Sequence, residues 1–158
     1  MQNLRSILVL FGLALALISG CASTPEASLE NDAIAKDFTP AQNAAIIYIS
    51  RPVGAGRGVS TLWVDGRLVG ESLPQSFFRV STRPGRNRIT TSANDPGRFQ
   101  LDTQSNGVYF VEARVDGDTQ SEATTNFRQV SPEAGKAAIA ACCRMLETWR
   151  PGQPRLNF

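Results

Sequence analysis

Histidine is absent from this chain of 158 residues, and cysteine, methionine, tryptophan and tyrosine are scarce. The lack of histidine removes the side chain that most often acts as a general base near neutral pH, and the most common neutral metal ligand. A serine nucleophile would have no imidazole partner. We therefore predict no catalytic residues, no metal site and no cofactor, and we expect that the protein is not an enzyme.

An excess of charge of one sign is missing as well. The chain has 16 basic and 14 acidic residues, a net charge of +2. Nucleic-acid-binding proteins usually carry a clustered basic surface, so we expect no nucleic-acid partner. Arginines at the edges of apolar runs favour solvated strand faces, but they leave open a patch for an anionic glycan or lipid, formed by Arg79, Arg86, Arg88 and Arg98.

The three cysteines are Cys21, Cys142 and Cys143, too few for the disulfide framework of many small secreted domains. Cys142 and Cys143 are adjacent, and the interior of a helix does not permit a bridge between neighbours. We expect Cys142 in the core and Cys143 at its border. Both are interpreted as structural thiols, because a buried cysteine behaves as a small hydrophobic residue.

No apolar run is long enough for a membrane span, which needs about 20 residues. The longest, residues 7–18, has 12 residues, follows Arg5 and precedes Ser19, Gly20 and Cys21. This length suits the hydrophobic region of a secretory signal, about 7–15 residues. A plain secretory signal and a short span are the alternatives.

The order of these features resembles the signal peptide of a bacterial lipoprotein, and residues 18–21 (ISGC) resemble a lipobox. The resemblance implies diacylglycerol on the Cys21 sulfur, cleavage before Cys21 and acylation of the new N-terminus. Cys21 would thus attach the protein to a membrane. An aspartate directly after Cys21 would resemble an inner-membrane retention signal. This chain has Ala22 there, and the absence of the aspartate favours the periplasmic face of the outer membrane.

The chain after this signal divides into a leader, a domain and a tail. Residues 1–20 are the predicted signal peptide, and residues 21–43 are a lipidated N-terminus with a flexible tether, since they are polar and contain two prolines. A flexible chain of 20 residues spans about 25 Å. The alternative that residues 33–38 pack on the domain stays open. Residues 44–149 form the predicted domain, and residues 150–158 a tail.

The domain has the pattern of a mainly β protein. Apolar runs bounded by Gly, Pro, Asn and Asp recur about every ten residues, which favours an antiparallel β-sandwich of about seven to eight short strands. The predicted strands are residues 45–49, 60–64, 67–69, 77–80, 88–91, 99–102, 108–115 and 124–130. Asp65 and Gly66 predict a tight hairpin turn between two of them.

One C-terminal helix is expected to pack on the sandwich. Ser131 is a suitable N-cap and Pro132 suits the first helical position. An apolar stripe at helical spacing continues as far as Trp149, and Tyr109 and Val111 are expected beneath the helix. The members of the stripe are Ala138, Ile139, Cys142, Met145, Leu146 and Trp149.

Four segments together are similar to an uncharacterised domain of bacterial lipoproteins, related in pattern to PEGA-like β-sandwich modules. They are residues 47–52 (IYISRP), 64–70 (VDGRLVG), 83–89 (RPGRNRI) and 107–111 (GVYFV). The resemblance covers about residues 44–146. It implies the fold and carries no catalytic residues. That family often has histidine or lysine after Pro-Gly, where this chain has Arg86, Asn87 and Arg88.

Two further patterns invite a chemical interpretation. The glycines of residues 54–58 would suit a phosphate loop only if a helix followed, whereas a strand pattern follows, so we expect a flexible hairpin loop. The aspartates lack the spacing of a calcium loop and are expected to be turn residues. They are Asp65, Asp95, Asp102, Asp116 and Asp118.

The sequence therefore predicts a lipid-anchored protein of the bacterial cell envelope with a non-enzymatic interaction or structural role. Its partners would be the membrane, through Cys21, and an envelope protein or peptidoglycan. The alternative is an envelope enzyme or a glycan-binding accessory protein that uses the arginine-rich strand edges.

Overall fold

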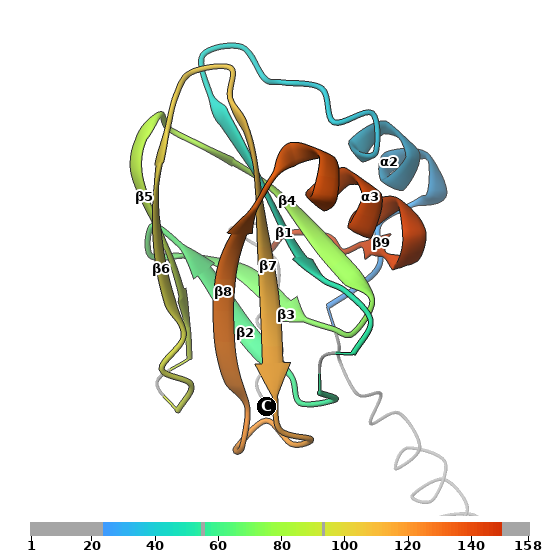
Figure 1. Cartoon of the computed structure of the whole chain (residues 1–158), viewed down its shortest axis with the longest axis vertical. Helices are drawn as coiled ribbons and strands as arrows, with labels where there is room; N and C mark the ends of the chain where they lie inside the picture. Colours follow the sequence, from blue (N-terminus) through green and yellow to red (C-terminus); the bar gives the residue numbers. More distant parts are fainter. Residues whose placement is uncertain (1–23, 55, 93, 150–158) are drawn as a thin grey trace, which may run out of the picture.

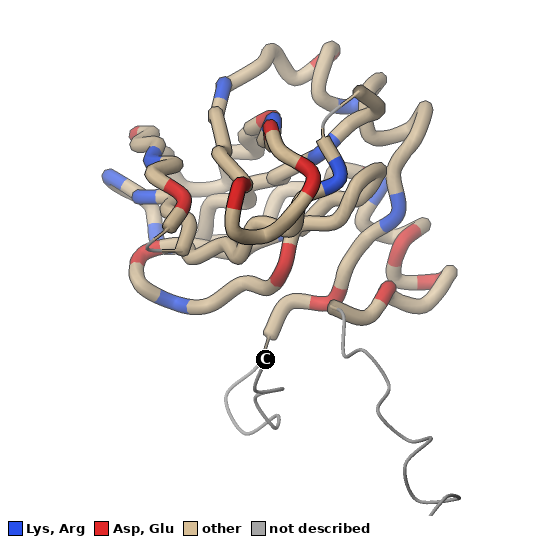
Figure 2. The backbone as a smooth tube through the Cα atoms, turned by 90° about the horizontal axis from the view of Figure 1, so that it is seen from below, with Lys and Arg blue, Asp and Glu red and all other residues tan. Residues whose placement is uncertain are grey.

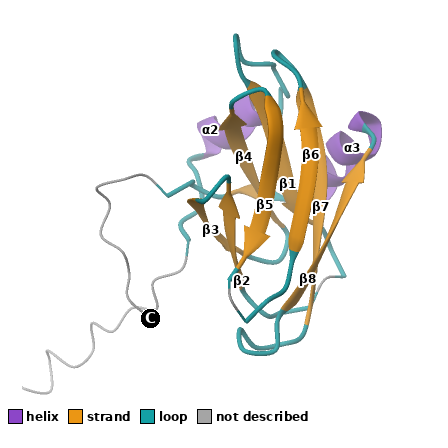
Figure 3. Ribbon diagram, turned by 90° about the vertical axis from the view of Figure 1, so that its left-hand side faces the viewer, coloured by secondary structure: helices purple, strands orange, loops and turns teal. Residues whose placement is uncertain are grey.

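The computed structural model describes residues 24–54, 56–92 and 94–149. Its strands form two sheets packed face to face, and two helices lie on the outer face of one sheet (Figure 1). Seen from the side, the four-stranded sheet lies in front of the five-stranded sheet, with the helices behind (Figure 3). The predicted fold class, a mainly β sandwich with a C-terminal helix, is confirmed.

All eight predicted strands are present, and a short ninth strand follows the C-terminal helix. The elements in chain order are α2 (Leu29–Ala35), β1 (Ala45–Arg51), β2 (Ser60–Val64), β3 (Arg67–Ser72), β4 (Ser76–Thr82), β5 (Gly85–Thr91), β6 (Arg98–Thr103), β7 (Val108–Asp116), β8 (Thr124–Val130), α3 (Pro132–Cys142) and β9 (Arg144–Met145).

The sheets have the strand orders β8-β7-β1-β4-β9 and β3-β2-β5-β6. Most neighbouring strands are antiparallel, but β1 pairs with β7 and β4 pairs with β9 in parallel. Asp65 and Gly66 form the predicted tight turn between β2 and β3, with φ angles of 50° and 75°. Positive φ at both central positions is what a two-residue hairpin turn requires.

Strand β1 is buried on both faces, as its continuous apolar sequence predicts. Ile47 and Ile49 face the core between the sheets, whereas Ile46 and Tyr48 face the helices. The ring of Tyr48 stacks on Phe110, with ring centroids 5.1 Å apart, and its hydroxyl donates a 2.6 Å hydrogen bond to the carbonyl of Ala35 in α2. The helices therefore cover an aromatic layer.

The prediction that Tyr109 and Val111 lie beneath the C-terminal helix is wrong. Both belong to the core between the sheets, and Phe110 between them faces α3. Successive residues of a strand point to opposite faces, so the correct side depends on which sheet face the helices cover. Gly135 of α3 lies against the Phe110 ring so closely that an added Cβ would overlap it.

Helix α3 begins as predicted and ends earlier than predicted. Ser131 is its N-cap, and the hydroxyl accepts a 3.2 Å hydrogen bond from the Ala134 N–H. The helix ends at Cys142, and Cys143 has extended backbone angles, φ −112° and ψ 143°. Met145, Leu146 and Trp149 are thus not on the helix, since the chain leaves it to pair along β4 as β9.

Candidate functional site

The N-terminal part of the described chain is bound to the C-terminal strand. The Ala27 N–H donates a 2.9 Å hydrogen bond to the Met145 carbonyl, and the Glu147 N–H donates one of 2.9 Å to the Pro25 carbonyl. Glu26 and Leu146 form an antiparallel bridge between these segments. Because β9 itself pairs with β4, residues 25–27 extend the edge of the five-stranded sheet.

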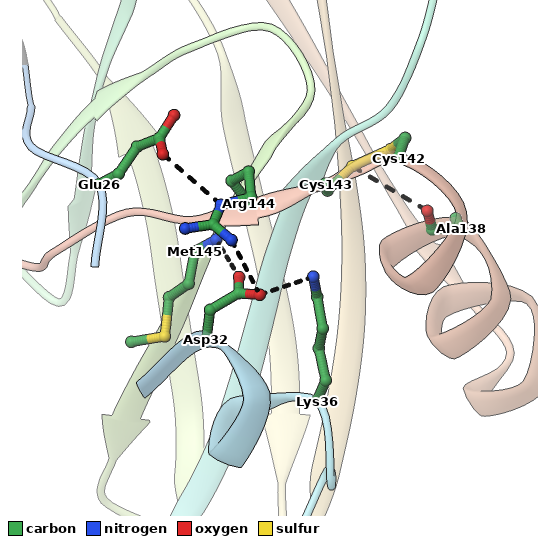
Figure 4. A network of polar contacts seen from close by, with 8 residues as sticks. All are labelled: Glu26, Asp32, Lys36, Ala138, Cys142, Cys143, Arg144 and Met145. Carbon is green, nitrogen blue, oxygen red and sulfur yellow. Dashed lines mark hydrogen bonds and ion pairs between the residues drawn. A yellow bond between two sulfur atoms is a disulfide. The ribbon is translucent and has the colours of Figure 1, made fainter. Parts of the chain in front are cut away.

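Asp32 holds α2 on β9 (Figure 4). Its carboxylate accepts a 2.8 Å hydrogen bond from Lys36 and a 2.7 Å hydrogen bond from the Met145 N–H. Arg144 lies 3.7 Å from the same carboxylate and 3.5 Å from that of Glu26. These contacts join the first helix to the last strand.

The contacts of Asp32 also shift its pKa. Its burial by itself would raise the pKa, but hydrogen bonds from Lys36 and Met145, with the charges of Lys36 and Arg144, outweigh burial. The pKa therefore lies below the ordinary value of 3.8, and the carboxylate is charged at neutral pH. A charged and paired Asp32 strengthens the attachment of α2.

The predicted flexible tether is corrected by these contacts. Residues 24–43 include α2, whose Ala35 is buried in the layer between the helices and the sheet, and Phe38 packs against the same layer. Within residues 33–38, for which packing on the domain is the alternative, Ala35 and Phe38 pack on it, whereas Ala33 and Ile34 are exposed. The polar composition of residues 24–43 suggests a solvated linker, but two of the polar residues have structural roles. Ser28 is the N-cap of α2, and Asp32 is a buried partner in an ion pair.

The outward side of α2 carries exposed apolar side chains beside Glu30 and Asn31. Leu29 is 74% exposed and Ile34 is 59% exposed, with Ala33 also exposed beside them. Within the described residues, the third exposed large hydrophobic side chain is Val53, in the loop after β1. Two of the three thus belong to the short helix nearest the N-terminus.

The prediction of two free thiols is wrong, because Cys142 and Cys143 form a disulfide (Figure 4). The helix interior would forbid such a bridge, but α3 ends at Cys142 and the backbone of Cys143 is extended. The expected burial is reversed as well. Cys143 is buried beneath the helices, and Cys142 is half-buried. The position of the helix end could not be read from the apolar stripe, which continues past it.

The glycine loop at residues 54–58 connects the two sheets and is not a hairpin. The N–H groups of Gly56 and Gly58 donate to the carbonyls of Val115 and Gly117, at 2.6 and 2.9 Å. Arg51, fully buried, donates to the carbonyls of Ser72 and Gly56. Burial lowers the pKa of Arg51 to about 10. Strand β2 follows the loop, so no helix N-terminus faces these N–H groups.

Asp95 is the one buried member of the predicted turn aspartates. It accepts a 3.0 Å hydrogen bond from the Gly97 N–H in its own turn, as predicted, and bonds to Ser60 and Thr125 from two other strands. Burial would raise its pKa, but these hydrogen bonds, with one from the Thr125 N–H, outweigh it and lower the pKa. Asp95 thus ties the sheets together at one end of the sandwich.

The other aspartates do not gather into one site. Asp65 accepts hydrogen bonds from Asn87 and from the Arg88 N–H, and Asp102 lies 3.5 Å from Arg86. Asp116 and Asp118 lie by the turn after β7. In the part of the chain that the structure describes, no group of three or more cysteine, aspartate or glutamate residues is arranged to hold a metal ion.

Three of the four arginines singled out from the sequence share a surface. Arg86 and Arg88 on β5 and Arg98 on β6 are exposed on the outer face of the four-stranded sheet. Arg79 lies on the other sheet, where it donates to the Tyr48 hydroxyl. Trp63 on β2 is half-buried and faces outward like the three arginines. It lies opposite Thr90 of β5, and Thr90 lies opposite Arg98 of β6, so the three side chains share one face of the sheet.

These features define a β-sandwich in which the first helix of the described residues is held on their last strand. No family model matches the chain. An uncharacterized protein of Haemophilus influenzae is 32% identical over 134 residues, which cover 83% of this chain and 79% of that protein. The chain belongs to the same family as this protein. Among the helices described, none has the length and hydropathy needed to cross a membrane.

Proposed function

We propose that the protein is a lipid-anchored module of the bacterial cell envelope, attached through Cys21 and acting by interaction or as a structural element. The order of Arg5, the apolar residues 7–18 and Cys21 carries the proposal. Cys21 lies outside the described residues. Ala22 in place of aspartate favours the periplasmic face of the outer membrane.

The expected lipid explains how a chain with so short an apolar run would stay on a membrane. Each buried methylene contributes about 0.8 kcal/mol, and a single acyl chain gives only marginal binding. The diacylglycerol and the amide-linked acyl group together supply three chains, which would make attachment lasting. Processing before Cys21 would remove the apolar run itself.

A non-enzymatic role agrees with the way the buried polar side chains are used. Asp32, Arg51 and Asp95 each bond to backbone or side-chain groups from distant parts of the chain, so each has a structural explanation. We propose that the role of the domain depends on its surface and not on a reacting group.

Fractionation of cells that express the full chain tests the proposal. The unchanged protein should stay with membranes after a carbonate wash, and Cys21→Ser should yield a soluble protein or an unprocessed precursor that is larger on a gel. The matched control replaces the other two cysteines, Cys142→Ala with Cys143→Ala, and should leave membrane attachment unchanged. A processed Cys21→Ser protein that remains on washed membranes would exclude the lipid as the anchor.

A second candidate function is binding of an anionic glycan, and one observation favours it. The outward side chain of Trp63 lies on the same sheet face as Arg88 and Arg98, so an aromatic surface adjoins two cations. Titration with peptidoglycan fragments tests it, with Trp63→Ala expected to abolish binding. The exposed Gln129→Ala on β8 is the matched control. Absence of binding by the unchanged protein would reject this candidate.

A further inference from the structure

We propose that the exposed apolar side chains of α2 lie against the lipid surface to which Cys21 attaches the chain, so that the domain is held flat on the membrane and not at a distance from it. This inference rests on the proposed lipid anchor. Its contact residues are Leu29, Ala33 and Ile34, all exposed on the outward side of the helix. The partner is a lipid surface with zwitterionic headgroups.

The chain between the expected lipid on Cys21 and the domain is short. Thr24 already belongs to the domain, since its hydroxyl accepts a 2.8 Å hydrogen bond from the Glu71 N–H of β3. Three residue steps separate Thr24 from Cys21. Each step spans at most about 3.6 Å, so the two Cα atoms lie within about 11 Å of each other. A lipid on Cys21 would therefore bring the domain to the headgroups.

Helix α2 is held in place on the domain by contacts with the segment around β9. Residues 25–27 pair with the segment after α3, and Asp32 is bound to Lys36 and to the Met145 N–H. Figure 1 shows α2 at the periphery of the domain. The helix is thus held on the domain, and the surface that it presents is fixed with respect to Thr24, three residue steps from Cys21.

The exposed side of α2 combines apolar side chains with one carboxylate. At 100° per residue, Asp32 and Ala35 point inward, and Glu30 lies near the middle of the opposite side. Ala33 and Ile34 flank Glu30, and Leu29 lies at the edge of this side. Apolar side chains of an interfacial helix enter the boundary between headgroups and acyl chains. The lipid supplies the affinity, because a linked second contact occurs at high effective concentration and can be weak by itself.

Charge selects the kind of lipid. The exposed residues around α2 include Glu30 and Asp37, and Figure 2 shows acidic positions on the side of the molecule where α2 lies. Glu26 is paired with Arg144. Lys36 is already paired with Asp32. Acidic side chains around α2 are not attracted to anionic headgroups. The affinity of α2 for the lipid should therefore depend on apolar burial and should change little with salt.

A fluorescent label on α2 tests the inference in the lipidated protein. Ile34→Cys is labelled with an environment-sensitive fluorophore without reductant, which leaves the Cys142–Cys143 disulfide closed. The protein is reconstituted into phosphatidylcholine vesicles, with or without nitroxide-labelled lipid. We expect a blue shift of the emission and strong quenching by the nitroxide, little altered when phosphatidylglycerol is added or salt is raised.

The control label is Gln100→Cys, exposed on β6 of the other sheet. It should keep the emission of a water-exposed fluorophore and show at most a fraction of the quenching at position 34. Equal exposure to water at both positions, in protein that is firmly bound to vesicles, would overturn the inference and leave the anchor intact. Protein that fails to bind vesicles at all would overturn both.

A second copy of the chain is the other occupant that this side of α2 could bind. Dimerisation would shift the emission at position 34 in detergent solution without vesicles, increasingly with protein concentration, and that result would also contradict lipid contact. A variant with Leu29→Glu and Ile34→Glu gives a further test. It should remain folded and lipid-anchored, and the segment around α2 should exchange amide hydrogens faster on vesicles than in the unchanged protein.

Discussion

The Asp32 carboxylate of α2 accepts a 2.7 Å hydrogen bond from the backbone N–H of Met145 in β9, and so joins residues 113 positions apart in the chain. The bond connects the segment nearest the N-terminus to the edge of the five-stranded sheet. It converts a stretch with the composition of a linker into part of the domain.

Asp32→Asn should destabilise the folded protein by about 1–3 kcal/mol at neutral pH, because a buried N–H group and Lys36 lose a charged acceptor. Chemical denaturation measures the loss. Glu30→Gln, an exposed position on the same helix, is the control and should change stability by less than about 0.5 kcal/mol. Equal effects of the two substitutions would mean that Asp32 does not hold α2.

Stability should fall on acidification because Asp32 and Asp95 both have lowered pKa values. Their contribution is complete above the unfolded-state pKa of about 3.9, and it is lost as pH falls through the lower folded-state values. Denaturation curves between neutral pH and pH about 3 should show this loss, reduced in Asp32→Asn and in Asp95→Asn. A variant with the same acid dependence as the unchanged protein would contradict the assignment for that residue.

Leu146→Ala should cost about 2–5 kcal/mol, since Leu146 is 1% exposed in the core between the sheets. The cost reflects the closing of the sandwich by the segment after α3, and not the docking of a helix. Leu29→Ala is the control of the same chemistry at a 74% exposed position and should be nearly neutral. Thermal unfolding distinguishes them, and equal melting temperatures would reject the burial of Leu146.

Gly135→Ala should destabilise the protein by about 1–3 kcal/mol, although alanine normally favours a helix over glycine by about 1 kcal/mol. The reason is that the new methyl group would overlap the Phe110 ring. Phe110→Leu should relieve part of that cost, so a double-mutant cycle should show a favourable coupling. A gain in stability from Gly135→Ala alone would show that α3 does not lie as close to β7 as described.

The disulfide predicts the reactivity of the cysteines. Folded, lipidated protein should take up no thiol reagent before reduction and two equivalents after it, one at each of Cys142 and Cys143. Cys142 is half-buried and Cys143 is buried, so reagent should reach Cys142 first. Peptide mapping after labelling measures the order. Rapid uptake by unreduced protein would contradict the bridge.

The sequence predicted the strands well because turns and apolar runs are local signals. Asp65 and Gly66 fix a hairpin whatever surrounds it, and the apolar residues of β1 require burial on both faces. The same local information could not show which face of β7 the helices cover. The sequence therefore predicts the wrong side of β7 for Tyr109, because it does not show that α3 packs over Phe110.

The features at the N-terminal junction depend on contacts between distant residues. The stripe from Ala138 to Trp149 has helical spacing. The chain after Cys142 nevertheless pairs along β4, and Leu146 is buried in the core between the sheets. Asp32 has no sequence signal for burial, because its partners Arg144 and Met145 come from the other end of the chain. The N-cap Ser28, with an acidic first turn, was the one local indication of α2.

Lipid attachment at Cys21 is tested most directly by mass spectrometry of the N-terminal peptide of protein isolated from bacterial membranes. We expect a mature chain that begins at Cys21, with diacylglycerol on the sulfur and an acyl group on the α-amine. A mature chain that begins elsewhere, or an unmodified Cys21 thiol in the membrane-bound protein, would contradict it.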